Sequence, residues 1–366
     1  MKDKIATHLY DNFVNGRVKP LRLHIGPTTL CNLNCGFCWR QGFPTNENYL
    51  PPERFVSLIH EAADLGVEIV HLQGSGEPFF YKPDLVPVMQ AIKERGMYGN
   101  IVTNGTLFDK EKTSLMVEIG WDEINFSLDS TIADVHDELR GAKNVFAKVI
   151  QAITDFNHLK DKHRFDKPLI NLHVVITNRN YREIRKIFKL AERLNINSVH
   201  FIPLLVTSPM AAELDLSLKQ RLWLENEVDR IIDSNIPGFI QNNLVYFGRQ
   251  ARILQFFRVE DFEKPLGNRD LIWNKVFCFE PWYSISIDNS VVDYCDVIEN
   301  TGLNINNCSL SQAWNSETFS QARQKFISGI GEGKCRNCCM PDSIFDLRQR
   351  LIDFKGNKIC QYAAGR

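Results

Sequence analysis

The sequence predicts an α/β protein: a (β/α)6 partial barrel followed by a small cysteine-rich C-terminal domain. Short β-rich runs alternate with amphipathic helical patterns over the first two thirds of the 366 residues. This alternation predicts parallel strands with right-handed crossovers. The ten cysteines form two groups, three between residues 31 and 38 and seven between residues 278 and 360. An open doubly wound sheet would fit the alternation equally well.

Six runs are expected to form the barrel strands, because each is short, rich in β-branched or apolar residues and bounded by turn residues. They are Leu21 to Gly26, Glu68 to Gln73, Asn100 to Thr103, Glu123 to Asp129, Leu169 to Thr177 and Ser198 to Leu204. Between them, apolar residues recur at helical spacing. Examples are Leu85, Val88, Met89 and Ile92, and then Ile184, Ile187, Phe188 and Ala191.

The expected domains follow from where this pattern starts and stops. Residues 1–20 are expected to be an N-terminal extension, and residues 21–235 the barrel, which closes with a helix from about Leu218 to Asp233. Residues 236–273 read as an aromatic-rich connection, and residues 274–366 as the C-terminal domain.

Composition and charge narrow the class of partner. The formal net charge is -1, with 43 Lys and Arg against 44 Asp and Glu, so bulk charge does not favour nucleic acid. The sequence shows neither a cleavable leader pattern nor an apolar run long enough to cross a bilayer. A cytoplasmic protein is therefore expected, and cytosolic cysteines serve more often as metal ligands or redox groups than as disulfides.

The strongest chemical signal is Cys31-x-x-x-Cys35-x-x-Cys38, directly after the first expected strand. Three thiolates on one tight loop can hold three corners of a 4Fe-4S cluster and leave the fourth iron open for another ligand. The alternative is zinc, which usually draws on two knuckles of paired ligands. Since no fourth Cys or His lies near this loop, iron-sulfur is favoured.

The segment CNLNCGFC resembles the signature of the radical S-adenosylmethionine superfamily, with aromatic Phe37 before its third cysteine. The resemblance implies a partial TIM barrel and an open iron that chelates S-adenosylmethionine. Reduction of the cluster would then give a 5'-deoxyadenosyl radical that abstracts a hydrogen atom from the substrate. A reducing partner such as flavodoxin or ferredoxin is also implied.

Further motifs match this superfamily in order. The run Gly74, Ser75, Gly76, Glu77 and Pro78 resembles its GGEP motif, which holds the methionine ammonium, with Ser75 in place of the usual glycine. Taken alone, such a run is more often an ordinary Gly-rich turn. Its place after the second expected strand favours the cofactor-binding interpretation.

Four more residues are expected to contact S-adenosylmethionine by the same resemblance. They are Asn104, Ser127, Asp129 and Arg140. Strand alternation sends Asn125, Ser127 and Asp129 to one face, at the strand end where α/β sheets bind ligands. Asn104 and Asp129 are also common turn residues. Arg140 is expected to pair with the methionine carboxylate; the alternative is a solvated surface arginine.

The same alternation predicts a polar lumen. Polar residues on several strands fall opposite the main apolar residues, which favours a polar substrate with several hydrogen-bonding groups. They are His24, His71, Gln73, Asn125, Asn171 and His173. For any single histidine, a satisfied core position remains the alternative.

The C-terminal cysteines give the second strong signal. Cys278, Cys295, Cys335 and Cys338 could close a complete cluster or a zinc ribbon. After a core of this kind they resemble the SPASM/Twitch extension, which implies one auxiliary 4Fe-4S cluster. In full SPASM domains two further cysteines follow, but Ile344 and Arg348 stand there, and Ser290 replaces a usual glycine. Three cysteines are left over and are expected to be core thiols; the alternative is that one of them is an extra ligand or a hydrogen-atom donor. They are Cys308, Cys339 and Cys360.

The function expected from these signals is a radical S-adenosylmethionine oxidoreductase acting on a small polar metabolite such as an aminocyclitol or sugar. A peptide maturase is the alternative, weakened by the short segment before the first strand. The molybdenum-cofactor cyclase ends in Gly-Gly, whereas this chain ends in Ala-Ala-Gly-Arg. A non-catalytic zinc-binding interaction module is the alternative of another class. The sequence singles out no catalytic acid or base.

Overall fold

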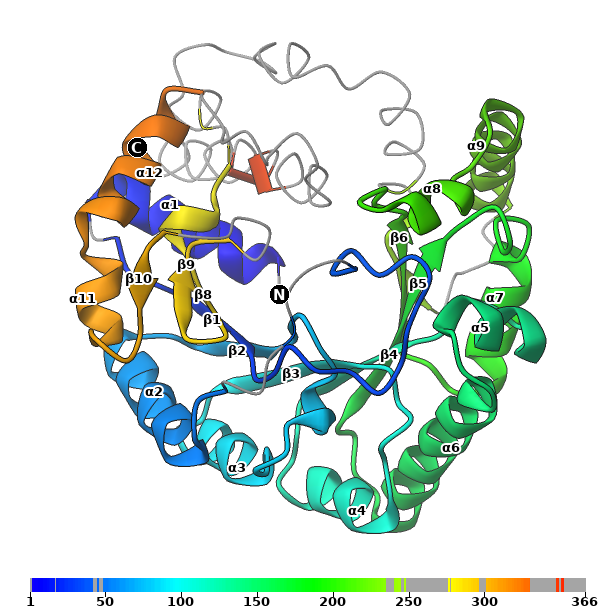
Figure 1. The fold of residues 1–366 in the computed structure, drawn as a ribbon, viewed down its shortest axis with the longest axis horizontal. Coiled ribbons are helices and arrows are strands. Elements are labelled where there is room, and N and C mark those ends of the chain that lie inside the picture. The colour runs from blue at the N-terminus through cyan, green and yellow to red at the C-terminus, as the bar shows by residue number, and fades with distance from the viewer. Residues whose placement is uncertain are drawn as a thin grey trace, which may run out of the picture. The chain divides into compact units, whose positions relative to one another are not determined.

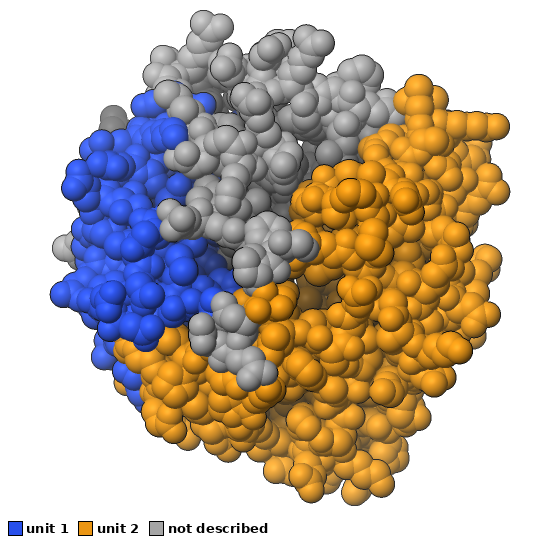
Figure 2. Space-filling view, viewed as in Figure 1, with its two compact units in different colours: residues 1–24, 57–69, 257–366 blue, residues 25–56, 70–256 orange. Residues whose placement is uncertain are grey.

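The computed structural model describes most of the chain and divides it into two compact units (Figure 2). The described residues are 2–16, 18–41, 45, 49–234, 240–244, 247, 276, 278–295, 301–329, 347–348 and 350–351. Unit 1 comprises residues 1–24, 57–69 and 257–366, and unit 2 comprises residues 25–56 and 70–256. Two strands and one helix run from one unit into the other: β1 (Arg22–Gly26), β2 (Ile69–Leu72) and α2 (Pro52–Leu65).

Unit 2 is built on a curved parallel sheet whose strands follow one another in chain order (Figure 1). After β1 and β2 come β3 (Tyr98–Thr103), β4 (Glu123–Ser127), β5 (Leu169–Ile176), β6 (Ser198–Pro203) and β7 (Gln241–Asn242). Strands β3 to β7 pair in parallel. Because the order never reverses, the sheet is the predicted partial barrel and not a doubly wound sheet.

Helices cover the outer face of this sheet (Figure 1). They are α3 (Val86–Glu94), α4 (Lys110–Glu118), α5 (Ala133–Arg140), α6 (Val145–His163), α7 (Ile184–Arg193) and α9 (Leu218–Asp233), and a 3-10 turn covers Pro78–Phe80. Helix α8 (Pro209–Glu213) follows the end of β6, and its N-cap Ser208 bonds the Gln41 side chain (3.0 Å). The predicted closing helix is α9. Alternate strand residues such as Ile124, Phe126 and Leu172 are fully buried toward these helices. The ring of Phe126 packs with those of Phe108 and Phe156.

The opposite face of the strands carries the polar residues that alternation predicted. Register pairs Asn125 with Asn171, and Ser127 with His173. The amides form a ladder: Asn125 Nδ2 donates to Asn100 Oδ1 (2.8 Å), and Asn171 Nδ2 to Asn125 Oδ1 (3.2 Å) and Glu123 Oε1 (2.8 Å). Buried amides that pair in this way satisfy one another without water.

A buried carboxylate secures the opposite end of the barrel strands. Asp122 precedes β4, is 2% exposed, and accepts hydrogen bonds from Lys93, Lys167 and the Gly99 amide (2.8 Å to the latter). Burial alone would raise its pKa, but the lysine hydrogen bonds outweigh it and hold the pKa below its usual range.

Unit 1 contains three antiparallel strands of the ten-stranded sheet. Strand β8 (Ser284–Asp288) pairs with β9 (Val291–Asp293), and β9 pairs with β10 (Leu303–Asn304). The β8–β9 turn holds Asn289 at φ 48° and Ser290 at φ 69°. Two consecutive positive φ angles are what a type I′ hairpin turn requires, and glycine suits the second position best. This geometry gives a physical reason for the glycine that the family resemblance leads one to expect at residue 290.

Three α-helices and a 3-10 turn complete the described part of unit 1. They are α1 (Lys2–Asn15), η4 (Glu280–Trp282), α11 (Leu310–Trp314) and α12 (Glu317–Ile327). Helix α1 falls in the segment expected only as an extension. It buries Ile5, Ala6 and Leu9, and Asn12 Nδ2 donates to the Trp282 carbonyl (3.0 Å). In the described part of the chain, no helix is long and apolar enough to cross a bilayer.

We expect Asp122→Asn to lower the free energy of unfolding by about 3 kcal/mol, because it removes the charge that compensates two lysines around a buried site. Urea unfolding measures the change. Asp109→Asn is the matched control: Asp109 is an exposed N-cap of α4 that also bonds a lysine, and Asn caps equally well. Equal losses in both variants would contradict the role given to Asp122.

Candidate functional site

The predicted site residues of unit 2 gather where its strands end. The segment 31–41, which we call the cysteine loop, follows β1 and carries Cys31, Cys35 and Cys38. Its second half is closed by its own backbone, since Cys38 N donates to Cys35 O (3.2 Å) and Gln41 N to Cys38 O (3.0 Å). The Gln41 side chain also donates to Cys35 O (2.8 Å). The spacing of the cysteines is thus held by hydrogen bonds within the loop.

The GSGEP run packs its backbone directly against the segment that leads into the loop. Glu77 N donates to Leu30 O (2.9 Å). A Cβ atom on Gly76 would lie 2.1 Å from Leu30 O, and one on Gly74 would lie 2.5 Å from the Gly26 Cα atom. Both glycines are therefore required by close backbone approach. Ser75, between them, is buried.

The Glu77 carboxylate is hydrogen-bonded to the end of β3 and the turn that follows it. It accepts hydrogen bonds from Thr103 Oγ1 (2.7 Å), Asn104 N (2.7 Å) and Phe79 N (3.3 Å). Burial raises its pKa to about 7, although these hydrogen bonds oppose the rise. In this arrangement Glu77 joins the ends of β2 and β3, and a direct contact with a methionine ammonium stays a prediction.

Asn104 supports the cysteine loop from the end of β3. Its Nδ2 donates to Asn32 Oδ1 (2.9 Å) and lies 3.9 Å from Cys31 Sγ. The Leu33 amide donates to the same sulfur (3.4 Å). Cys31 therefore has two N–H groups directed at its sulfur atom.

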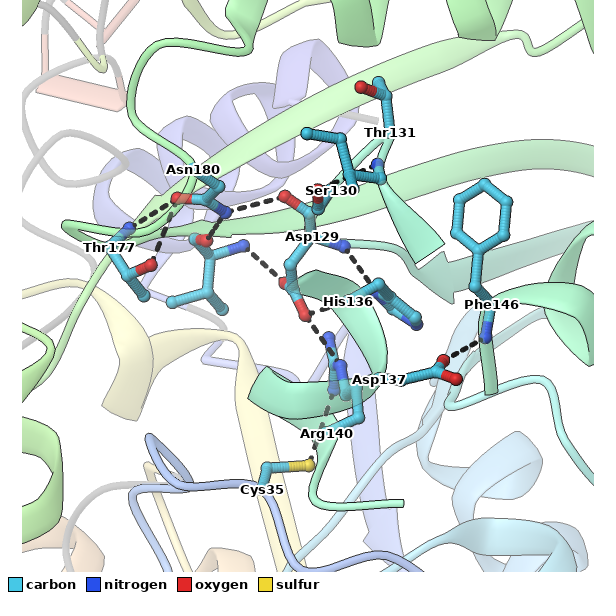
Figure 3. Close-up of polar contacts among 12 residues, drawn as sticks. Cys35, Asp129, Ser130, Thr131, His136, Asp137, Arg140, Phe146, Thr177 and Asn180 are labelled. Carbon is cyan, nitrogen blue, oxygen red and sulfur yellow. Dashed lines mark hydrogen bonds and ion pairs between the residues drawn. The ribbon is translucent and has the colours of Figure 1, made fainter. Parts of the chain in front are cut away.

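Asp129 is the centre of a polar network at the end of β4 (Figure 3). Its side chain is fully buried and accepts from Arg140 Nε (2.7 Å) and Val175 N (2.9 Å). Its amide donates to His136 Nδ1 (3.2 Å), and its carbonyl accepts from Asn180 Nδ2 (2.6 Å). Each polar group of Asp129 thus has a protein partner.

Arg140 reaches from this network to the cysteine loop (Figure 3). The residue is 7% exposed, so the solvated-surface interpretation is wrong. Its Nη1 lies 3.9 Å from Cys35 Sγ, and its guanidinium lies 5.1 Å from the Phe37 ring centroid. Its Nη2 has no partner among the described residues, and pairing with a methionine carboxylate stays a prediction.

The end of α5 also fixes the loop backbone. Gly36 N donates to Leu139 O (3.2 Å). Gly141 has φ 67°, and a Cβ atom there would lie 2.2 Å from Asn34 O. At the end of α5, Gly141 is therefore required for close packing against Asn34, and Arg140 supplies the charge that pairs with Asp129.

Sequence reasoning missed three members of this network. Asn180 and Glu183 lie after β5, and His136 lies within α5. Asn180 accepts from Thr177 N (2.7 Å) while it donates to Asp129 O, and Glu183 accepts from Ser130 Oγ (2.9 Å) and Thr131 N (2.8 Å). Polar residues just after a parallel strand were the available signal, but only the fold shows that they meet the β4 end.

The described residues fit an iron-sulfur cluster. A four-iron cluster takes one thiolate per iron and favours N–H donors to its sulfurs, as found at Cys31 and Cys35. Among the described residues, no three His, Cys, Asp or Glu side chains lie close enough together to bind a single metal ion. A four-iron cluster does not require such a group, because each thiolate binds a different iron.

Burial favours the protonated form of two thiols of the loop, those of Cys31 and Cys35. Burial raises the pKa of Cys35, against the opposing charge of Arg140. The pKa of Cys31 is raised to about 11 by loss of solvent around its sulfur, although the residue as a whole is exposed. Binding of iron must therefore release protons.

The C-terminal cysteines are partly described. Cys278 is buried, and Cys295 and Cys308 are half-buried. Cys335, Cys338, Cys339 and Cys360 lie outside the described residues. Arg348 is buried, donates to Val276 O (2.7 Å), and has its pKa lowered by burial against the opposing charge of Cys278. The auxiliary ligand set stays a prediction.

Ser127 is half-buried on the inner face of the barrel, beside two histidines. It is in register with His173, which is in register with His200 on β6. The two rings lie 5.4 Å apart between centroids. Burial, the neighbouring His200 and the charge of Arg140 lower the pKa of His173 to about 3, so its imidazole is neutral at physiological pH.

The family of this chain is shown by comparison with known sequences. Residues 25–205 match the Radical SAM superfamily. The chain belongs to this superfamily. It is therefore an enzyme, and the family implies S-adenosylmethionine and a 4Fe-4S cluster as its cofactors. The match spans the cysteine loop and β2 to β6.

Curated relatives align with about half of the chain. The Fe-coproporphyrin III synthase of Methanosarcina barkeri is 32% identical over 197 residues, which are 53% of this chain and 47% of that protein. A probable GTP 3',8-cyclase of Saccharolobus solfataricus is 31% identical over 191 residues, 51% of this chain and 58% of that protein. The chain thus spans about half the length of the curated relatives it matches.

Solved structures share the fold over nearly the whole chain. SuiB of Streptococcus suis bound to its precursor peptide SuiA has a TM-score of 0.66 at 18% identity, over 94% of this chain and 74% of that chain. The enzyme anSMEcpe with bound AdoMet and a peptide has a TM-score of 0.61 at 16% identity, over 94% and 99%. Both support the partial-barrel fold.

We expect Gly76→Ala to reduce iron bound at the cysteine loop and to cost about 3 kcal/mol of stability, because its Cβ would overlap Leu30 O. Gly36→Ala is the control within the loop, since its Cβ would make ordinary contact with Leu214 Cδ1 at 3.5 Å. Iron analysis after anaerobic reconstitution measures the difference. Full iron content in Gly76→Ala would refute the close-packing requirement.

His136 should make stability depend on pH. It is fully buried, and burial lowers its pKa to about 3 from 6.5. Above pH 6.5 the imidazole is neutral in both states. Below that value only the unfolded chain gains the proton, so stability should fall by about 1.4 kcal/mol per pH unit.

The measurement is urea unfolding between pH 5 and 7. His136→Gln should lower the slope of the unfolding free energy against pH by nearly the full value of about 1.4 kcal/mol per pH unit. His158→Gln, on the exposed face of α6, is the control and should leave this slope unchanged. An unchanged dependence in His136→Gln would show that His136 has the same pKa in the folded and unfolded states and would contradict the effect of burial.

Proposed function

We propose that the chain is an oxidoreductase that cleaves S-adenosylmethionine reductively and removes a hydrogen atom from a small polar metabolite, such as an aminocyclitol or a sugar. The observation that carries this proposal is the position of Arg140, buried between Asp129 and Cys35 at the end of β4. A cofactor with one carboxylate beside the loop would meet a preorganised guanidinium there. When bound, the cluster with S-adenosylmethionine supplies a 5'-deoxyadenosyl radical.

The site residues take their roles in this proposal from the family motifs. We assign the first cluster to Cys31, Cys35 and Cys38, and contacts with S-adenosylmethionine to the following residues: Phe37, Gly74, Ser75, Gly76, Glu77, Asn104, Ser127, Asp129 and Arg140. The geometry supports direct contact best for Ser127, on the inner face of the barrel, and for Arg140, beside Cys35 of the cysteine loop. Glu77, Asn104 and Asp129 support the site through the protein groups that they bind.

The polar inner face supports a polar substrate. Of the predicted lumen residues, Asn125 and Asn171 already satisfy each other. Next to this amide pair along the same face, Ser127, His173 and His200 are in register on β4, β5 and β6. We infer that the substrate lies against these three, where the neutral imidazole of His173 can accept a hydrogen bond from a substrate hydroxyl.

Oxidation requires an acceptor for one electron, and the C-terminal cysteines supply it in this proposal. Cys278, Cys295, Cys335 and Cys338 would hold an auxiliary 4Fe-4S cluster of the SPASM/Twitch type. The TM-scores to SuiB and anSMEcpe over more than nine tenths of the chain support an extension of this type. A flavodoxin or ferredoxin would supply the electron that cleaves S-adenosylmethionine.

A peptide substrate is the second candidate. SuiB is described in complex with a precursor peptide and anSMEcpe with peptides. Their fold extends over most of this chain, whereas the curated relatives with synthase and cyclase names align with about half of it. A peptide would reach the same inner face of the barrel through one side chain.

The test is anaerobic reconstitution followed by assays for iron and for cleavage. The protein should hold about eight irons and, with dithionite, convert S-adenosylmethionine to 5'-deoxyadenosine. The variant Cys31→Ala, Cys35→Ala, Cys38→Ala should lose cleavage and keep about four irons. Cys278→Ala should lose the other set.

Two outcomes would overturn the proposal. Stoichiometric zinc without cleavage would support the zinc-binding interaction module. Unchanged iron content in Cys278→Ala would remove the auxiliary cluster and with it the oxidation step. Deuterium transfer from labelled aminocyclitols or from labelled peptides into 5'-deoxyadenosine then separates the two substrate classes.

A further inference from the structure

Arg140 is placed to act on the cysteine loop as a fixed positive charge. Its Nη1 lies 3.9 Å from Cys35 Sγ, and its guanidinium lies over the Phe37 ring, two residues further along the loop. The residue is 7% exposed. Little water therefore screens its charge from the sulfur atom.

Asp129 determines where this charge sits. Its Oδ2 accepts from Arg140 Nε (2.7 Å), while its Oδ1 is held by the backbone amide of Val175 (2.9 Å). Its main chain is held in turn by His136 and Asn180. The guanidinium is therefore anchored to two strands and cannot turn away from the loop without breaking a buried ion pair.

The other charged groups near Arg140 do not replace it. The charge of Arg140 also slightly lowers the pKa of Glu77 against the larger effect of burial, but this carboxylate follows β2 and is hydrogen-bonded to the turn after β3. His136 is neutral, because burial lowers its pKa to about 3. Arg140 is a buried cation in contact with a cysteine of the loop, Cys35.

We propose that Arg140 raises the reduction potential of the cluster held by the cysteine loop, and that Asp129 limits this effect. Reduction adds one negative charge next to Cys35. A nearby cation in a poorly solvated site stabilises the reduced form, and net charge and hydrogen bonds to sulfur are known determinants of such potentials. This inference rests on the proposed cluster at Cys31, Cys35 and Cys38.

The experiment is an EPR-monitored redox titration of the reconstituted full-length protein without S-adenosylmethionine. The signal to follow is the one whose g values shift when S-adenosylmethionine is added afterwards, which separates it from any auxiliary cluster. Arg140→Gln should move the midpoint potential down. Asp129→Asn should move it up, because the counter-charge is lost while the guanidinium remains.

The matched control is Arg179→Gln, which removes an exposed arginine paired with Glu138 and should leave the potential unchanged. Opposite shifts in Arg140→Gln and Asp129→Asn would support the proposal, since general disruption of the loop would move both variants the same way. If the Arg140→Gln variant does not bind its cluster, the direction of the midpoint potential shift in Asp129→Asn tests the proposal on its own.

An unchanged or lowered potential in Asp129→Asn, or an unchanged potential in Arg140→Gln, overturns the inference. Its failure is distinguishable from failure of the proposed function. In the first case the wild-type protein shows the S-adenosylmethionine-sensitive signal and only the shifts are missing. In the second case the wild-type protein shows no such signal.

Discussion

The buried ion pair between Asp129 and Arg140 is the interaction on which the site depends most. Taking both charges out of water is costly, and the cost is recovered only when the remaining polar groups are also bonded. The protein meets this condition: Asp129 bonds to α5, to β5 and to Asn180, and Arg140 extends to Cys35. A pair of this kind adds little net stability but fixes one geometry, because any shift of α5 against β4 would leave a buried charge without its partner.

Three neighbouring segments hold the cysteine loop and the residue before it. The turn after β2 packs against the Leu30 backbone, Asn104 after β3 bonds the Asn32 side chain, and the end of α5 packs against the backbone of Asn34 and Gly36. Two of these contacts admit only glycine, at Gly76 and Gly141. Much of what looks like cofactor-binding sequence therefore shapes the loop itself. A loop positioned in this way presents its thiols at fixed spacing before any iron arrives, which lowers the conformational entropy lost on assembly.

Hydrophobic alternation predicted the six barrel strands to within about two residues, and helical periodicity predicted α3, α7 and α9. Helix α1 was missed, because its apolar stripe of Ile5, Ala6 and Leu9 is too short to distinguish a packed helix from an exposed one in the sequence alone. The structure shows that these residues are buried. The two-residue strand β7 carries no periodic signal at all. Asn180 and Glu183 were missed for a different reason. Their partners lie about fifty residues earlier in the chain, and a single sequence does not show which strand ends become neighbours.

The inner face of the barrel shows how far a polar pattern can be interpreted without a structure. Alternation placed Asn125, Asn171 and His173 on this face, and the register agrees. It did not show that the amides bond to Asn100, Glu123 and each other, which leaves them as a closed layer deep in the barrel. A layer of mutually satisfied amides offers little to a ligand, since binding would exchange equal hydrogen bonds. Recognition of a polar group is then left to the residues above that layer, Ser127, His173 and His200, of which His173 is influenced by the charge of Arg140. In the proposed function, the substrate and the cofactor would therefore bind at the same end of the strands, as transfer of a hydrogen atom between them requires.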